Sequence, residues 1–95
     1  CYEALQWIEQ NKLASTIAVV GDSAGGNLAA ALCLMARDRS SPKIDMQVLI
    51  NPAPDLTYGS ERKNDPFDSI RWQTKMYLSD PNDATNGYVS PLYRK

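Results

Sequence analysis

The sequence contains no histidine among its 95 residues. Histidine is the usual base that activates a serine or cysteine nucleophile, so the usual partner for such a nucleophile is missing. Cysteine is also scarce: Cys1 and Cys33 lie far apart and form no metal-spaced pair. Cys33 falls among apolar residues of a predicted helix, so we expect a buried or half-buried thiol and no metal site.

The sequence also lacks an excess of charge and a long apolar run. Ten basic and 11 acidic residues give a net charge of −1, which does not point to nucleic acid or an anionic membrane. No apolar run approaches the roughly 18 residues of a membrane-spanning helix, and no signal-peptide pattern opens the chain. We therefore expect a cytoplasmic protein with no membrane span and no nucleic-acid partner.

The composition is that of a folded domain, with 43% hydrophobic and 22% charged residues. The length allows at most one small domain and is short for an α/β enzyme. The chain opens on Cys1, within what its spacing predicts to be a helix. Together with the missing histidine, this leads us to expect a fragment of a longer protein.

Apolar residues in the first half of the chain alternate between helical spacing and short continuous runs. Residues 2–11 and 27–38 have helical spacing and predict amphipathic helices. Residues 16–20 form an apolar run that predicts a strand covered on both faces, and residues 46–50 predict a second strand. This order predicts a right-handed βαβ unit, and hence an α/β fold with a parallel sheet.

The second half of the chain is less regular. Residues 51–66 predict a long irregular loop, of the kind that often forms a lid or a binding segment. Asp65 and Pro66 predict the start of a helix that reaches about Ser79. The residues that this helix is expected to bury are Phe67, Ile70, Thr74 and Tyr77. Residues 80–95 are rich in turn formers, and no linker divides the chain.

A G-x-S-x-G motif, Gly21 to Gly25, lies between a predicted strand and a predicted helix. Such a turn holds its serine, here Ser23, in strained backbone geometry with the hydroxyl clear of the sheet. We expect glycine at positions 21 and 25 because the turn is so tight that neighbouring chain would otherwise collide with a Cβ. We expect Gly26 to let the helix lie close to the neighbouring strand. The N–H of Ala24, at the positive end of the helix, can stabilise an oxyanion.

Other interpretations of this glycine-rich turn are a device that only tightens packing or a phosphate site at the helix N-terminus. The glycines do not fit G-x-G-x-x-G, and no G-K-[ST] follows, so neither nucleotide fingerprint matches. Residues 22–26 also resemble the G-D-S-G-G segment of chymotrypsin-like proteases with an alanine inserted. Those proteases are all-β, however, and a long helix does not follow their segment.

The longer string at residues 21–29, GDSAGGNLA, resembles the nucleophile elbow of the hormone-sensitive-lipase-like esterases, a branch of the α/β-hydrolases. Trp7 and Ile8 are similar to the helix before the family's nucleophile strand. Residues 48–52 are similar to the next strand and its exit, and residues 88–92 to an "SPL" stretch. The resemblance implies a partial α/β-hydrolase domain over residues 1–95, with the family's H-G-G-G segment upstream and its acid and histidine downstream.

The resemblance also implies a function, that of a serine carboxylic-ester hydrolase acting through an acyl-enzyme on Ser23. The Ala24 N–H would be one oxyanion donor, Asp22 would have no chemical role, and no cofactor would be needed. The substrate would be a small acyl ester, hydrolysed by the full-length protein and not by these 95 residues alone. The alternative is a non-catalytic binding or receptor protein built on the same sheet.

Three further features leave alternatives open. Asp55 follows the second strand, where some α/β-hydrolases place their triad acid, but the resemblance favours a solvated or turn-forming aspartate. The tyrosines either line an acyl pocket or pack in the core or at the surface, and they are Tyr58, Tyr77, Tyr88 and Tyr93. Two strands leave both sheet edges unpaired, so we expect self-association, strand swapping, packing against another chain or a place within a larger structure.

Overall fold

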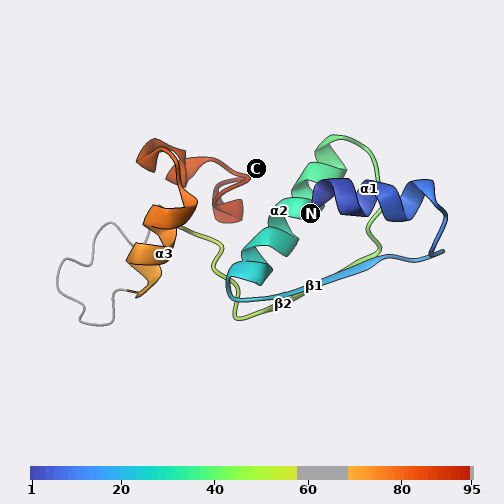
Figure 1. The fold of residues 1–95 in the computed structure, drawn as a ribbon, viewed down its shortest axis with the longest axis horizontal. Coiled ribbons are helices and arrows are strands. Elements are labelled where there is room, and N and C mark those ends of the chain that lie inside the picture. Colours follow the sequence, from blue (N-terminus) through green and yellow to red (C-terminus); the bar gives the residue numbers. More distant parts are fainter. Residues whose placement is uncertain (58–68, 95) are drawn as a thin grey trace.

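The structure is a computed structural model that describes residues 1–57 and 69–94 (Figure 1). Its regular elements are α1 (Tyr2–Gln10), β1 (Ala18–Asp22), α2 (Ala24–Asp38), β2 (Met46–Ile50) and α3 (Ser69–Tyr77), followed by the short 3-10 helices η2 (Pro81–Thr85) and η3 (Pro91–Tyr93). The expected helix start at Asp65 and Pro66 lies outside the described residues, as do Tyr58 and Phe67.

The two strands form a parallel pair in which Ala18 is opposite Met46 and Asp22 is opposite Ile50. Helix α2 connects them and packs against both, so the expected βαβ unit and α/β fold are confirmed (Figure 1). Strand β2 has the expected bounds. Strand β1 begins and ends two residues later than expected, because its ladder with β2 continues through Gly21 to Asp22.

The expectation that the first strand is covered on both faces is wrong within the described residues, and the second strand is exposed as well. Val20 is 63% exposed and Met46 is 60% exposed, and every residue of β2 is exposed. The reason is that α2 covers one face, while the described chain places no element against the opposite face (Figure 1). The sheet therefore presents an apolar face that these residues do not cover, and the expected self-association stays a prediction.

The core is small and lies where α2 meets the sheet and α1. Its buried apolar residues are Leu5, Ala29, Ala31 and Ala36. Alanine side chains allow a helix to approach a sheet closely, which suits a helix that must follow directly from a strand. Helix α2 begins at Ala24, three residues before the expected start, and Leu5 anchors the expected amphipathic helix α1.

Helix α3 differs from its expected packing. Tyr77 is 52% exposed and Thr74 is half-buried, so the face expected to be buried is largely open among these residues. Nothing is described of the Ile70 side chain. The exposed Tyr77 side chain borders a cavity rather than a core.

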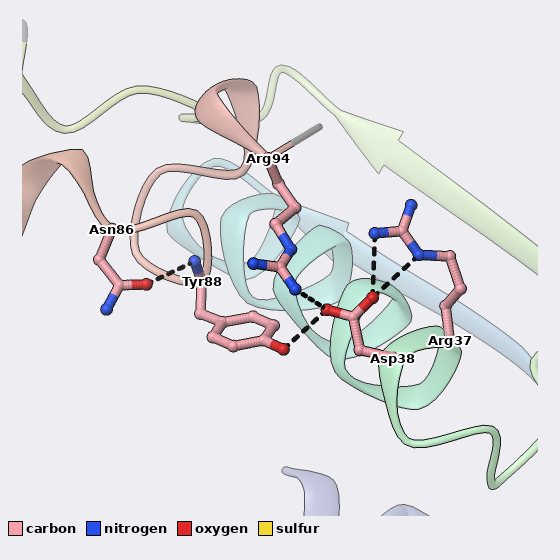
Figure 2. A network of polar contacts seen from close by, with 5 residues as sticks. All are labelled: Arg37, Asp38, Asn86, Tyr88 and Arg94. Atoms are coloured by element: carbon pink, nitrogen blue, oxygen red, sulfur yellow. Dashed lines mark hydrogen bonds and ion pairs between the residues drawn. The ribbon is translucent and has the colours of Figure 1, made fainter.

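The C-terminal segment is fastened to the end of α2 by a polar cluster around Asp38 (Figure 2). The Asp38 carboxylate accepts hydrogen bonds from the Tyr88 hydroxyl at 2.7 Å and from the guanidinium groups of Arg37 and Arg94. The Arg94 guanidinium also lies 5.0 Å from the centre of the Tyr88 ring. The Asn86 side-chain oxygen accepts a hydrogen bond from the Tyr88 N–H at 2.9 Å. This bond stabilises the turn that positions Tyr88 beside Asp38.

This cluster predicts an unusual titration of Asp38. The Tyr88 hydroxyl, followed by Arg37 and Arg94, lowers the pKa of Asp38 from 3.8 to about 2. Because the folded-state pKa is depressed, the contribution of Asp38 to stability is present above its unfolded pKa and is lost as the pH falls towards 2.

Carboxyl carbon NMR of the folded protein should therefore show Asp38 still ionised at about pH 3, where an ordinary aspartate is mostly protonated. Tyr88→Phe should raise the Asp38 pKa, because it removes the largest of the three lowering contributions. An Asp38 that titrates near 3.8 in the unaltered protein would contradict the cluster.

Candidate active site

Ser23 lies at the turn between β1 and α2, with φ 53° and ψ −114°. A non-glycine residue in such a conformation costs about 1–3 kcal/mol and persists only where its surroundings hold it. The Ser23 N–H donates to the Ile50 carbonyl at 2.9 Å. The Ser23 carbonyl accepts from the N–H groups of Asn27 and Ala53, each at 3.2 Å. The strained residue is thus fixed from the helix, from β2 and from the loop after β2.

The Ser23 hydroxyl is exposed and makes no capping bond, although Ser23 is the N-cap residue of α2. Serine at this position ordinarily accepts a hydrogen bond from an N–H of the first helical turn. Here the hydroxyl has no hydrogen-bond partner among residues 1–57 and 69–94. The positive φ therefore leaves the hydroxyl outside the helix and available to a ligand.

The first backbone N–H groups of α2 are also available. Those of Ala24, Gly25 and Gly26 have no acceptor in the described part of the chain. They lie at the positive end of a helix of 15 residues, where a negative charge is stabilised. The Ala24 N–H, next to the exposed hydroxyl, is the oxyanion donor that the sequence predicts.

The three glycines around Ser23 differ in whether their surroundings leave room for a side chain. A Cβ on Gly21 would lie 2.0 Å from the carbonyl oxygen of Gly25, and a Cβ on Gly26 would lie 2.8 Å from the Pro52 Cβ. Both positions therefore require glycine, as expected. The packing reason expected for Gly25 is wrong for the described residues, because a Cβ there would meet no atom within 4 Å. The backbone of Gly25 is what approaches Gly21, and its own missing side chain makes no difference.

A cavity of about 380 Å³ opens beside the serine. Ser23 and Ala24 form part of its wall, and the remaining lining comes from α2, the loop after β2 and α3, namely Asn27, Leu28, Ala53, Leu56, Gln73, Thr74 and Tyr77. The volume is in the range of small-molecule sites, which are mostly apolar with a few polar groups. A larger hollow of about 460 Å³ near Cys33 and Lys43 contains none of the expected site residues.

Asp55 lies in the loop after β2, and its carboxylate forms hydrogen bonds with Thr57 and Tyr93. Its carboxylate accepts from the Thr57 N–H at 2.8 Å, from the Thr57 hydroxyl at 2.6 Å and from the Tyr93 hydroxyl at 3.3 Å. The Thr57 hydroxyl is the main cause that lowers the pKa of Asp55. These contacts are those of a turn-forming aspartate, the interpretation that the family resemblance favoured.

The remaining candidate residues lie elsewhere. Of the described tyrosines, Tyr77 borders the cavity, whereas Tyr88 binds Asp38 and Tyr93 binds Asp55. Cys33 is a half-buried free thiol, as expected, and burial raises its pKa. Across the described residues, no group of three or more metal-binding side chains comes together. No helix described here is long and apolar enough to cross a membrane.

Two buried polar residues near the site were not predicted from the sequence. Asn27 is 3% exposed and Ser90 is fully buried. The Asn27 side-chain amide donates to the carbonyls of Ala53 and Val89. The Ser90 hydroxyl donates to the Ala84 carbonyl at 2.5 Å and accepts the Leu56 N–H at 2.8 Å. One sequence feature could have indicated the role of Asn27, namely an asparagine within the first turns of an apolar helix. A buried side-chain amide needs hydrogen-bond partners, so such a residue points to polar contacts with other segments.

A sequence profile described as "alpha/beta hydrolase fold" matches residues 1–95. The chain belongs to the alpha/beta hydrolase fold family. This membership confirms the fold class and the family expected from the GDSAGGNLA string. Proteins with this fold catalyse many different reactions, so the fold alone does not identify the function. The function must be inferred from the strained serine, the free N–H groups and the cavity.

Relatives within the alpha/beta hydrolase fold family include named esterases. An arylesterase of Saccharolobus solfataricus is 35% identical over 97% of this chain and 34% of its own length. The carboxylic ester hydrolase LipN of Mycobacterium tuberculosis is 33% identical over 96% of this chain and 29% of its own length. The chain thus spans about a third of the length of the curated relatives that it matches.

Solved structures of the same family superimpose closely. A hyperthermophilic esterase from the archaeon Pyrobaculum calidifontis matches with a TM-score of 0.83 and 39% identity, covering 99% of this chain and 36% of that one. Carboxyl esterase 2 of the fungus Tuber melanosporum matches with a TM-score of 0.82 and 30% identity, covering 100% of this chain and 35% of that one.

Proposed function

We propose that this chain is the nucleophile-bearing part of a longer serine carboxylic-ester hydrolase in which Ser23 forms an acyl-enzyme. One observation carries the proposal: the Ser23 hydroxyl is exposed, makes no capping bond and borders a cavity. A serine that only stabilised the helix would use its hydroxyl as a cap. The esterase relatives support the same reaction class.

The proposed reaction begins with attack of the Ser23 Oγ on the acyl carbon of the ester. The serine proton passes to a histidine base in another part of the complete protein, because these 95 residues contain no histidine. The carbonyl oxygen becomes an oxyanion and accepts the free Ala24 N–H. Collapse of this intermediate expels the alcohol, which takes the proton from the base. Water then attacks the acyl-enzyme, releases the carboxylic acid and restores the Ser23 hydroxyl.

The cavity supports an acyl group of short to medium length as the bound part of the substrate. Its apolar lining includes Leu28, Leu56 and Tyr77, and it contains no Asp, Glu, Lys or Arg among its described lining residues. A volume of about 380 Å³ is in the range of small-molecule sites and accommodates a small ester. An uncharged acyl ester is therefore the substrate class that the walls favour.

Covalent labelling tests the proposal directly. A fluorophosphonate should label Ser23 in the complete protein, because the reagent requires an activated serine beside an oxyanion site. The same protein should hydrolyse p-nitrophenyl acetate and butyrate. The 95-residue chain alone should not exceed background, because general-base assistance is worth about 10²- to 10⁴-fold in rate and the chain has no histidine to provide it.

Two results would count against the enzyme. Labelling at a serine other than Ser23 would overturn the assignment of the nucleophile. Absence of both labelling and hydrolysis in the complete, folded protein would favour the alternative of a binding or receptor protein that keeps the serine and has lost the base.

A further inference from the structure

Asn27 combines nearly complete burial with two hydrogen bonds at the active-site turn. Its side-chain Nδ2 donates to the Ala53 carbonyl at 2.7 Å and to the Val89 carbonyl at 2.8 Å. We propose that Asn27 is a positioning residue that holds the strained backbone of Ser23 through the peptide groups of Ala53. This inference rests on the proposed function, because positioning matters for catalysis only if Ser23 is the nucleophile.

The connection from Asn27 to Ser23 is short and continuous. The Ala53 carbonyl accepts from the Asn27 side chain, while the Ala53 N–H donates to the Ser23 carbonyl at 3.2 Å. Ala53 is therefore held on both sides. The backbone N–H of Asn27 donates to the same Ser23 carbonyl at 3.2 Å. Loss of the side-chain bond frees Ala53 to move, and the Ser23 carbonyl then keeps only its helical partner.

The second partner, Val89, widens the role of Asn27. Val89 belongs to the C-terminal segment, which also contacts the loop after β2 through the Leu92 N–H and the Pro54 carbonyl at 3.1 Å. Asn27 therefore joins the first turn of α2, this loop and the C-terminal segment at one point. The same loop contributes Ala53 and Leu56 to the cavity wall. A shift of the loop would move the nucleophile and the wall together.

The chemistry at position 27 requires a donor. Both partners are backbone carbonyls, which only accept hydrogen bonds, so both amide hydrogens are needed. Aspartate has the same shape but would place a carboxylate against two carbonyl oxygens. Leucine fills a similar volume but leaves both carbonyls without this donor. The two substitutions thus remove the hydrogen bonds while retaining most of the packing.

The test compares Asn27→Asp and Asn27→Leu with the unaltered complete protein, using p-nitrophenyl butyrate. We expect kcat to fall about 10- to 100-fold with little change in KM, because small displacements of a reacting atom cost about this much. Asp38→Asn is the matched control, since it loosens the same C-terminal segment at the opposite end of α2. It should lower the melting temperature while kcat stays near that of the unaltered protein.

Asn27→Ser separates hydrogen bonding from packing. Serine keeps one donor but leaves a larger void than leucine. If the donor positions Ser23, kcat of Asn27→Ser will exceed that of Asn27→Leu. A kcat below that of Asn27→Leu shows that only packing matters and overturns the proposal. This variant also provides the comparison if Asn27→Asp does not fold.

Failure of this inference is distinguishable from failure of the proposed function. If Asn27→Leu lowers kcat no more than Asp38→Asn, the positioning role is overturned, while fluorophosphonate labelling of Ser23 still supports the nucleophile. The unaltered protein could fail both to react with the fluorophosphonate and to hydrolyse esters. In that case, hydrogen exchange at the Ser23 and Ala53 N–H groups still tests whether Asn27 holds this backbone. Exchange that is unchanged in Asn27→Leu overturns the positioning role, and faster exchange supports it.

Discussion

Ser23→Ala is expected to lower kcat/KM for p-nitrophenyl butyrate by about 10⁴-fold or more in the complete protein. The substitution removes the only atom that can form the acyl-enzyme in the proposed reaction. KM and the melting temperature should change little, because the hydroxyl makes no hydrogen bond within the described chain and is exposed. Steady-state kinetics and thermal unfolding of the same preparation measure both.

Ser40→Ala is the matched control for this substitution. Ser40 is also an exposed serine with a positive φ, 55°, but it lies at the opposite end of α2. Its replacement should leave kcat/KM unchanged. Equal rates for Ser23→Ala and the unaltered protein would exclude Ser23 as the nucleophile, whatever the effect of Ser40→Ala.

Gly21→Ala is expected to have the largest effect on stability, lowering the free energy of unfolding by about 3 kcal/mol or more. The new Cβ would lie 2.0 Å from the Gly25 carbonyl oxygen and 2.6 Å from the Gly26 nitrogen. Both are backbone atoms of the first turn of α2, so neither can turn aside as a side chain does. The turn must open, and the Ser23 conformation must change with it.

Gly25→Ala tests the same turn without the collision. A Cβ there would meet nothing within 4 Å, and Gly25 does not have a positive φ. Alanine is favoured over glycine within a helix by about 1 kcal/mol, so this variant should be as stable as the unaltered protein or slightly more so. Urea unfolding compares the two variants. Similar losses of stability in both would contradict the tight approach of Gly21 to the helix.

The local features of this fold were predictable because short-range patterns determine them. The apolar run of β2 and the glycines around Ser23 each identified an element from a few neighbouring residues. The bounds of β1 were missed because Gly21 and Asp22 are poor strand formers that the ladder with β2 includes nonetheless. The start of α2 was placed too late for a similar reason: two glycines concealed the first turn.

The site was predictable only where it is local. Ser23 and Ala24 follow from the motif, and the structure gives them an exposed hydroxyl and a free N–H. The role of Asn27 depends on carbonyls that lie 26 and 62 residues further along the chain, and no local pattern encodes those partners. The same holds for Gln73 and Thr74, which reach the cavity from α3.

The bond from the Ser23 N–H to the Ile50 carbonyl has a consequence for transplanting this turn into another scaffold. A cassette of residues 21–27 would carry the glycines but not the carbonyl of Ile50 or the N–H of Ala53. In a foreign host the serine would relax to an ordinary backbone conformation and turn its hydroxyl towards the helix. The smallest portable unit therefore extends from the start of β1 through Ala53, and the host must offer a carbonyl where Val89 supplies one.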